Sequence, residues 1–331
     1  MSKQPEPPRH LDGYLVKDLI GVGGMSAVYL ARNLRMQRDV ALKVLSPGQA
    51  KDELTRDRFI REGRLGGKMN HTNVVTYHDM RETDGWLYCA LEYVPGGDLT
   101  GLINKHRGKV PERLALGLVR DIACGLEAIA RSGVVHRDIK PHNIFLTEDM
   151  IPKIADFSAA QPAAAAIQAD DMDRRAGLIL GSPSYMAPEQ VAGDKHIDAR
   201  ADIHGLGATL YHMLFGHPPY MGKTAKDVIR SVRDGPPPDP GAEKRRITRR
   251  SHDILITSLA KGRSDRFQTP RAMIDAIERA LHSANTEELQ RARTRTDEPA
   301  EQLEEELEDA NWSPSSRYSP SSLPFTWTEE F

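Results

Sequence analysis

Cysteine is almost absent from this chain of 331 residues, which has only Cys89 and Cys124. They lie far apart and in no metal-ligand spacing, which indicates two small core thiols in a reduced compartment. The chain also lacks any apolar run near the roughly 20 residues that a membrane helix needs. Its first ten residues, MSKQPEPPRH, lack the apolar centre of a signal peptide. We therefore expect a cytoplasmic protein without a membrane span.

A strong net charge is also lacking, since the formal value is −2. No overall basic field favours a nucleic-acid partner. Charge is uneven, however: from Ser283 onward there are 12 acidic and 4 basic residues, whereas the first 282 residues hold 35 acidic and 41 basic. The tail also ends in LPFTWTEEF, which contains Phe325, Trp327 and Phe331. Intramolecular docking of this acidic tail is therefore an alternative to a free, disordered tail, which its composition favours.

The spacing of apolar residues predicts four regions. Residues 1–12 read as a disordered leader, and residues 13–94 as a small, mostly antiparallel sheet with one helix at 55–70. Residues 95–282 are rich in helices, which we expect at 111–133, 201–216 and 251–262. Residues 283–331 are first acidic and then Ser/Pro-rich, which is typical of disorder.

Lys43 lies in VALKVL, an otherwise apolar run that is typical of a buried strand. A lone lysine in such a run usually extends its head group to water, because a buried ammonium is costly without a partner. Glu62 follows Phe59 by three residues and precedes Leu65 by three, so it lies on the apolar face of its predicted helix. The sequence therefore predicts an ion pair between Lys43 and Glu62.

A glycine-rich turn, GVGGMSAV (21–28), joins two predicted strands. Glycines let backbone amides approach phosphate oxygens, although most such turns are ordinary hairpins. Because this turn lies between two strands and not between a strand and a helix, it argues against a dinucleotide-binding fold.

The segment HRDIKPHN (136–143) follows a long predicted helix, and Asp156 lies further along in ADFS. An aspartate that accepts a hydroxyl proton, together with asparagine and aspartate oxygens for Mg²⁺, is what phosphoryl transfer requires. Alone, the segment would be a charged loop. The accompanying turn and predicted ion pair make phosphoryl transfer the better interpretation.

Eight segments occur in an order that resembles the protein kinase superfamily, most nearly the bacterial eukaryotic-like (Hanks-type) Ser/Thr kinases. They are GVGGMSAVYLA, VALK, REGRL, LEYVPGGDL, VVHRDIKPHN, ADFS, GSPSYMAPEQ and DRFQTPRAM, within residues 13–282. The resemblance implies a two-lobed α+β fold with a small antiparallel-sheet N-lobe and a larger helical C-lobe. It also implies a signalling enzyme that transfers the γ-phosphoryl group of ATP, with Mg²⁺ or alternatively Mn²⁺, to Ser or Thr hydroxyls of a protein substrate.

The resemblance further implies residue roles. Asp138 is the catalytic base, Lys140 neutralises the transferring phosphate, and Asn143 and Asp156 hold the metal. Leu91 lines the adenine pocket, Glu92 and Val94 present backbone groups to adenine, and Asp98 reaches the ribose. Glu189 pairs with Arg266, and Asp202 braces the catalytic loop. The full nucleotide-binding set is Ile20, Gly21, Val22, Gly23, Gly24, Met25, Ser26, Ala27, Val28, Ala41, Lys43, Glu62, Leu91, Glu92, Val94 and Asp98.

Two departures from the family pattern bear on activity. Ser26 replaces a loop glycine, which we expect to be benign, and Ser158 follows Asp156-Phe157 where the family has glycine. A positive φ would cost serine about 1 kcal/mol or more, so we expect that the active conformation does not need one there. The alternative, a pseudokinase or scaffold module, depends on Ser158.

A small-molecule phosphotransferase is disfavoured because it would not need GSPSYMAPEQ, which resembles a peptide-docking loop.

The segment from Ala159 to Gly181 contains no Ser, Thr or Tyr. It therefore lacks an acceptor for activating phosphorylation, although Arg137 matches the arginine that would bind the phosphate. Asp170, Asp171 and Asp173 either supply fixed charge instead or form a solvated loop.

Three glycines, Gly63, Gly66 and Gly67, follow Glu62 closely. Each costs a helix interior about 1 kcal/mol relative to alanine, so we predict a mobile, regulated helix. The alternative is that the glycines allow the helix to pack closely on the sheet.

Overall fold

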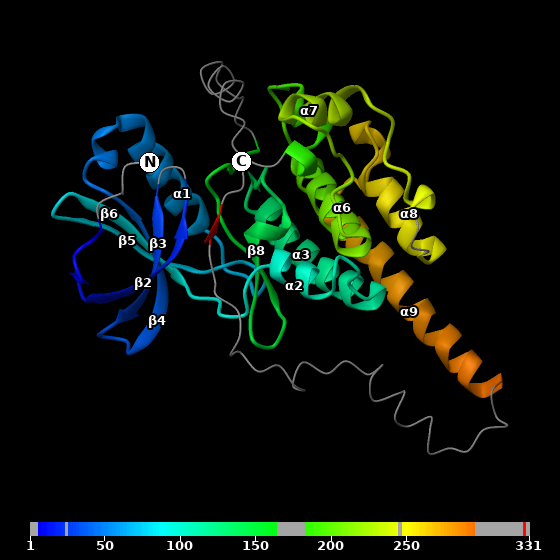
Figure 1. Ribbon diagram of the computed structural model, residues 1–331, viewed down its shortest axis with the longest axis horizontal. Coiled ribbons are helices and arrows are strands. Elements are labelled where there is room, and N and C mark those ends of the chain that lie inside the picture. Colours follow the sequence, from blue (N-terminus) through cyan, green and yellow to red (C-terminus); the bar gives the residue numbers. More distant parts are fainter. Residues whose placement is uncertain (1–5, 24–25, 164–182, 244–246, 295–326, 329–331) are drawn as a thin grey trace.

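The chain folds into two lobes, as expected. The structure, a computed structural model, describes residues 6–23, 26–163, 183–243, 247–294 and 327–328. A sheet with helix α1 (Glu53–Gly66) forms the N-lobe, and helices form most of the larger C-lobe (Figure 1). Among the described residues, no helix has both the length and the apolar character that a bilayer crossing requires.

The N-lobe sheet has antiparallel neighbours in the order β1-β2-β3-β4-β6-β5. Alternate residues of its strands face opposite sides, so Val40, Leu42 and Val44 enter one apolar cluster while Leu45 joins Phe59 of α1 in another. Lys43 shares the strand face of Leu45, which directs it toward α1. The strands are β1 (His10–Leu11), β2 (Tyr14–Val22), β3 (Ala27–Asn33), β4 (Arg38–Leu45), β5 (Tyr77–Thr83) and β6 (Trp86–Glu92).

The predicted disordered leader is wrong for its last residues. Strand β1 pairs with β2, with Leu11 opposite Tyr14, and Leu11 is buried in the N-lobe core. Asp12 and Gly13 join the two strands with φ values of 45° and 86°. Two successive positive φ values suit a tight hairpin, and Asp-Gly is a strong sequence signal for one.

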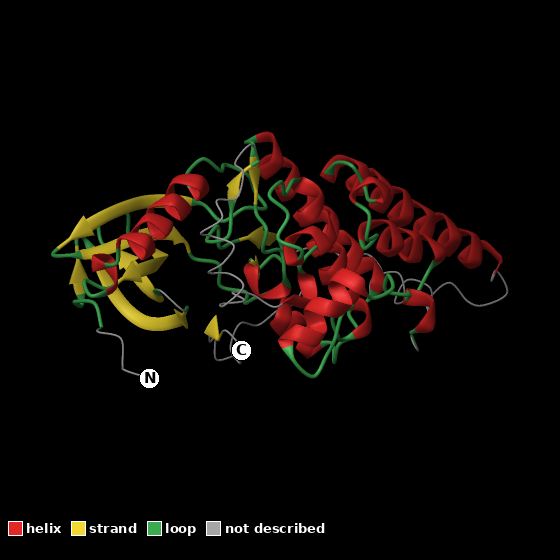
Figure 2. Ribbon diagram, turned by 90° about the horizontal axis from the view of Figure 1, so that it is seen from above, coloured by secondary structure: helices red, strands yellow, loops and turns green. Residues whose placement is uncertain are grey.

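Packed helices form the C-lobe core. The apolar stripe predicted within 111–133 lies on α3 (Glu112–Arg131), where Leu118, Ile122, Leu126 and Ile129 are almost fully buried. Each contributes roughly 1.5–3 kcal/mol through burial. The other C-lobe helices are α2 (Leu99–Lys105), α5 (Pro188–Val191), α6 (Ala199–Phe215), α7 (Ala225–Asp234), α8 (Arg249–Ser258) and α9 (Pro270–Thr294). Figure 2 shows them on one side of the molecule and the sheet on the other.

Helix α9 continues to Thr294, past the boundary expected near residue 283. The apolar pattern ends at Leu281, but residues 283–294, SANTEELQRART, include many good helix formers. Helical propensity therefore favours the longer element.

The connection between α1 and β5 belongs structurally to the C-lobe. The amide N–H of Val75 donates to the Ile154 carbonyl at 2.8 Å, and the Ile154 N–H donates to the Asn73 carbonyl at 2.9 Å. The Asn73 side chain donates to the Pro152 carbonyl at 2.9 Å. These bonds add the segment to β9 (Pro152–Ile154), which pairs with β8 (Ile144–Leu146). The C-lobe therefore includes a short piece from within residues 13–94.

Candidate active site

Lys43 and Glu62 form the predicted ion pair. The Lys43 Nζ atom lies 2.6 Å and 2.8 Å from the two carboxylate oxygens of Glu62, and 3.4 Å from Oδ1 of Asp156. Burial alone would lower the pKa of Lys43, but the Asp156 and Glu62 carboxylates outweigh it and raise that pKa above its usual value. Strand β4 and helix α1 of the N-lobe thus hold a permanent cation against an aspartate of the C-lobe.

A pocket opens beside this cluster, between the two lobes. Several predicted nucleotide-binding residues line it, together with Asp156. They are Ile20, Val28, Ala41, Lys43, Glu62, Leu91, Glu92 and Val94. The lining also contains residues that sequence reasoning missed: Val75, Tyr77, Tyr93, Phe145 and Ala155. Most of the lining is apolar, and Lys43, Glu62 and Asp156 form a charged cluster within it, which suits a ligand with a flat ring and an anionic group.

The glycine-rich turn follows β2, the strand that carries Ile20. The Gly23 N–H donates to the Ser26 carbonyl at 2.8 Å, and the side chain of Ser26 is buried. Gly21, Val22, Gly23, Ser26 and Ala27 therefore flank the pocket without lining it. Gly24 and Met25 lie outside the described residues.

Asp98 is not part of the lining. Its carboxylate accepts the Gly101 N–H at 2.8 Å and so caps the N-terminus of α2. It pairs through its backbone with Phe145, which does line the pocket. The structure thus gives Asp98 a structural role near the pocket, whereas its contact with a ribose stays a prediction.

Asp138 is held by two neighbours from its own loop. Its Oδ2 atom accepts a hydrogen bond from Nδ2 of Asn143 at 2.8 Å and lies 3.1 Å from Nζ of Lys140. The same Asn143 nitrogen also donates to the Asp138 carbonyl at 2.9 Å. Asn143 is buried in a short 3₁₀ turn, η2 (Pro141–Asn143). These bonds fix the Asp138 carboxylate and leave the Asn143 side-chain oxygen for another ligand.

Asp202 of α6 supports the backbone that leads to Asp138. Its two oxygens accept the N–H groups of His136 and Arg137 at 2.8 Å and 2.7 Å. Arg137 has a φ of 70°, which costs a non-glycine residue energy and persists only under such constraint. Burial raises the pKa of Asp202, and the bonds from His136 and Arg137 oppose that rise. The predicted bracing contact is therefore present.

Asp156 and Asn143 offer the kind of oxygen ligands that Mg²⁺ prefers, a carboxylate and an amide. Burial alone would raise the pKa of Asp156, but Lys43, Ser158 and Lys140 outweigh it and hold that pKa below its usual range. The backbone N–H of Ser158 donates to Asp156 Oδ1 at 3.2 Å. The positive φ of this segment, 64°, is at Asp156, and Ser158 has none. In this arrangement Ser158 therefore adopts no positive φ, in agreement with the expectation.

Aromatic rings connect the helix that bears Glu62 to the loop that bears Asp138. The Tyr77 hydroxyl donates to Glu62 at 3.3 Å, and its ring meets Phe157 edge-on at 5.9 Å. Phe157 in turn contacts His136 at 5.0 Å between ring centroids. A displacement of Tyr77 would thus disturb both Glu62 and, through Phe157, the loop that carries Asp138.

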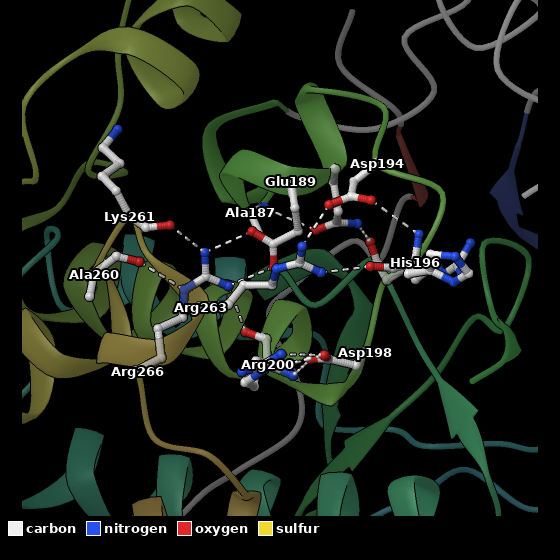
Figure 3. Close-up of polar contacts among 12 residues, drawn as sticks. Ala187, Glu189, Asp194, His196, Asp198, Arg200, Ala260, Lys261, Arg263 and Arg266 are labelled. Atoms are coloured by element: carbon white, nitrogen blue, oxygen red, sulfur yellow. Dashed lines mark hydrogen bonds and ion pairs between the residues drawn. The ribbon is translucent and has the colours of Figure 1, made fainter. Parts of the chain in front are cut away.

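The predicted pair between Glu189 and Arg266 is present and deeply buried (Figure 3). The two guanidinium NH₂ groups each lie 2.7 Å from one carboxylate oxygen. The remaining N–H groups of Arg266 donate hydrogen bonds to the backbone carbonyls of Ala260, Lys261 and Arg200. This pair ties the start of α5 to the segment between α8 and α9.

The glycines of α1 are explained by close packing and not by mobility. A Cβ atom on Gly66 would lie 2.5 Å from Cζ of Tyr77, and one on Gly63 would lie 2.6 Å from Sδ of Met80. Gly67 is the C-terminal cap of the helix and not part of its interior. The geometry therefore favours the alternative of a helix packed tightly on the sheet over the hypothesis of a mobile one.

Gly66→Ala should destabilise the fold and slow turnover. The added methyl group must displace the Tyr77 ring, and overpacking of this kind costs about 1–3 kcal/mol. The matched control is Gly117→Ala in α3, where a Cβ meets nothing within 4 Å, and which should stabilise by about 1 kcal/mol. Urea unfolding and turnover of both variants test this. Higher basal activity for Gly66→Ala would instead support the mobile-helix hypothesis.

Comparison with known proteins agrees with this geometry. A family model described as the protein kinase domain matches residues 14–281. The chain is 34% identical over 296 residues to serine/threonine-protein kinase PknB of Mycobacterium leprae, covering 88% of this chain and 46% of that protein. It is 35% identical over 272 residues to PknB of Mycobacterium tuberculosis, covering 80% and 42%. Against PknH of Mycobacterium bovis it is 33% identical over 268 residues, covering 81% and 44%. The chain thus spans less than half the length of these curated relatives.

Proposed function

The chain belongs to the protein kinase family, and we propose that it is a serine/threonine protein kinase of the bacterial eukaryotic-like type. One observation carries this proposal. The Lys43–Glu62–Asp156 cluster of the pocket is fully assembled, and Asp138 is anchored in the adjacent loop by Asn143. Relatives named serine/threonine-protein kinase support Ser or Thr as the residue that accepts the phosphate.

In the proposed reaction, a Ser or Thr hydroxyl of a protein substrate attacks the γ-phosphorus of ATP. A bond forms between the hydroxyl oxygen and phosphorus, the bond to the β–γ bridging oxygen breaks, and ADP leaves. Asp138 accepts the hydroxyl proton. Lys43 holds the α- and β-phosphates, and Lys140 offsets the charge on the transferring group.

Asn143 and Asp156 would hold the divalent cation, which when bound neutralises charge on the phosphates. Their oxygens suit Mg²⁺, and Mn²⁺ is the alternative. We further propose a cytoplasmic signalling role with a protein substrate. No nucleic-acid partner is proposed, because the charge pattern offers no basic field.

Transfer of radiolabel from γ-labelled ATP to a generic basic protein tests the proposal. Acid hydrolysis of the product should yield phosphoserine or phosphothreonine and no phosphotyrosine. Nucleotide binding without transfer would favour the pseudokinase alternative. Transfer to small hydroxyl compounds alone would favour a small-molecule phosphotransferase.

We also propose that the tail contacts the body of the chain. Strand β11 (Trp327–Thr328) pairs in parallel with β2, Trp327 with Gly21 and Thr328 with Val22. In both overall views it lies between the sheet and the helical lobe (Figures 1 and 2). The rest of residues 295–331 lies outside the described part.

Truncation after Thr294 should release the edge of β2. Amide hydrogen exchange at residues 20–23 should then accelerate several-fold, because backbone pairing protects these groups. If the opposite charges of tail and body contribute, high salt should have a similar but smaller effect on the full chain. Trp327→Pro should mimic the truncation, whereas Trp312→Ala, elsewhere in the tail, should not. If the full-length and truncated proteins showed equal exchange and equal activity at low and high salt, the tail would not contact the body.

A further inference from the structure

Arg137, the residue before the proposed base Asp138, is the meeting point of three elements. Its N–H donates to Asp202 of α6, and its carbonyl accepts from Nε2 of Gln190 in α5 at 2.8 Å. Its guanidinium Nη1 donates to Oε1 of Gln161 at 2.6 Å. The side chains of Arg137 and Gln161 are both almost fully buried. Whatever orients Arg137 therefore also orients the backbone that enters Asp138.

Gln161 is held in place from the other side. It begins β10 (Gln161–Pro162), which pairs with β7 (Val134–Val135), with Gln161 opposite Val135. Val135 is followed directly by the catalytic loop, and Gln161 lies just past Asp156-Phe157-Ser158. The Arg137–Gln161 bond therefore closes a short bridge between the proposed base and the segment that carries the proposed metal ligand.

A buried guanidinium needs acceptors, and a hydrogen bond from a charged donor is stronger than one between neutral groups. A glutamine oxygen supplies such an acceptor permanently. It needs no covalent modification, and Ala159–Gly181 has no hydroxyl group that could be modified. Asp170, Asp171 and Asp173, which could supply charge instead, lie outside the described residues.

We propose that Gln161 is a positioning residue that holds Arg137, and through it Asp138, in the catalytic arrangement without phosphorylation of the segment Ala159–Gly181. The inference rests on the proposed kinase function and adds how that site is kept active. Gln161 touches neither the nucleotide pocket nor Lys43. It acts on the rate of transfer and not on ATP binding.

Gln161→Met tests this directly, because methionine keeps much of the volume but offers no comparable acceptor. The kcat should fall by about tenfold to a hundredfold, as expected for a misplaced catalytic group, while the KM for ATP stays within about twofold of wild type. Gln161→Glu restores an acceptor oxygen and should recover most of the rate. Phosphatase treatment should leave the wild-type rate unchanged, and mass spectrometry should find no phosphate within Ala159–Gly181.

Gln268→Met is the matched control. Gln268 also accepts a hydrogen bond from an arginine, Arg200 Nη1 at 3.0 Å, but on an exposed part of the C-lobe. Its kcat should match wild type. Thermal unfolding and binding of an ATP analogue show whether Gln161→Met is folded. If it is not, Gln161→Asn, which keeps the amide and shortens the side chain, takes its place with the same expected fall in kcat.

Two results would overturn the inference while leaving the kinase function intact. One is a folded Gln161→Met enzyme with wild-type kcat, and the other is a large loss of wild-type rate after phosphatase treatment. A wild-type protein that transfers no phosphate under any condition would overturn both proposals.

Discussion

Asp138→Asn should lower kcat by about 10²- to 10⁴-fold, the usual range for loss of a general base, with ATP affinity almost unchanged. An amide cannot take up the hydroxyl proton. The hydrogen bond from Asn143 and the neighbouring Lys140 can nevertheless still hold the side-chain oxygen in place. ATP binding depends instead on the pocket around Lys43, which this substitution does not touch.

The measurement is single-turnover phosphate transfer beside titration with a fluorescent ATP analogue. Asp149→Asn is the control, because Asp149 is exposed in the turn between β8 and β9, and both quantities should match wild type. Near wild-type transfer by Asp138→Asn would refute the assigned base. Lost analogue binding would show that Asp138 supports the nucleotide site.

Arg266→Met should reduce the free energy of unfolding by about 3–5 kcal/mol, the range for breaking a buried ion pair from one side. It leaves the Glu189 carboxylate buried without the two guanidinium bonds of 2.7 Å that now satisfy it. It also removes the hydrogen-bond donor of the backbone carbonyls of Ala260, Lys261 and Arg200. Urea unfolding measures the loss.

Arg263→Met is the matched control. Its partner Asp194 lies at 2.6 Å, but both side chains of this pair are about one-third exposed, so the loss should stay near or below about 1 kcal/mol. Removing both charges, as Arg266→Met with Glu189→Leu, should recover part of the stability, since no uncompensated charge then remains. Equal losses for the two arginines would show that burial does not set the energy of the inner pair.

Sequence patterns were most informative where a charge interrupts an apolar run. Lys43 in a buried strand and Glu62 on a buried helix face each violate the local pattern, so their pairing could be predicted. The same argument could not identify Tyr77 or Val75 as pocket residues. Their position in the lining depends on the path of the chain between the two lobes, which no local pattern shows. Gln161 was missed because a lone glutamine between alanine and proline shows no local conflict.

Two further predictions differ from the structure because we judged disorder from overall composition and gave too little weight to short local sequence signals. The leader looked disordered from its prolines, although Asp12-Gly13 is a hairpin signal and Leu11 supplies a buried anchor. The start of the disordered tail was placed at residue 283 because of its acidic and Ser/Pro-rich composition, although helix-forming residues continue to Thr294. Both signals were present in the sequence, and both are short.

The attachment of Asn73 and Val75 to Ile154 has a consequence for synthesis on the ribosome. Asn73 is separated by 79 positions from Pro152, whose carbonyl it binds. At usual translation rates of about 5–20 residues per second, roughly 4 to 16 s pass between the synthesis of these two partners. During that interval the nascent chain has Lys43 and Glu62 but not β9, the strand that anchors the connection between α1 and β5. The smaller lobe is therefore made first but completed only when the larger one has begun to fold.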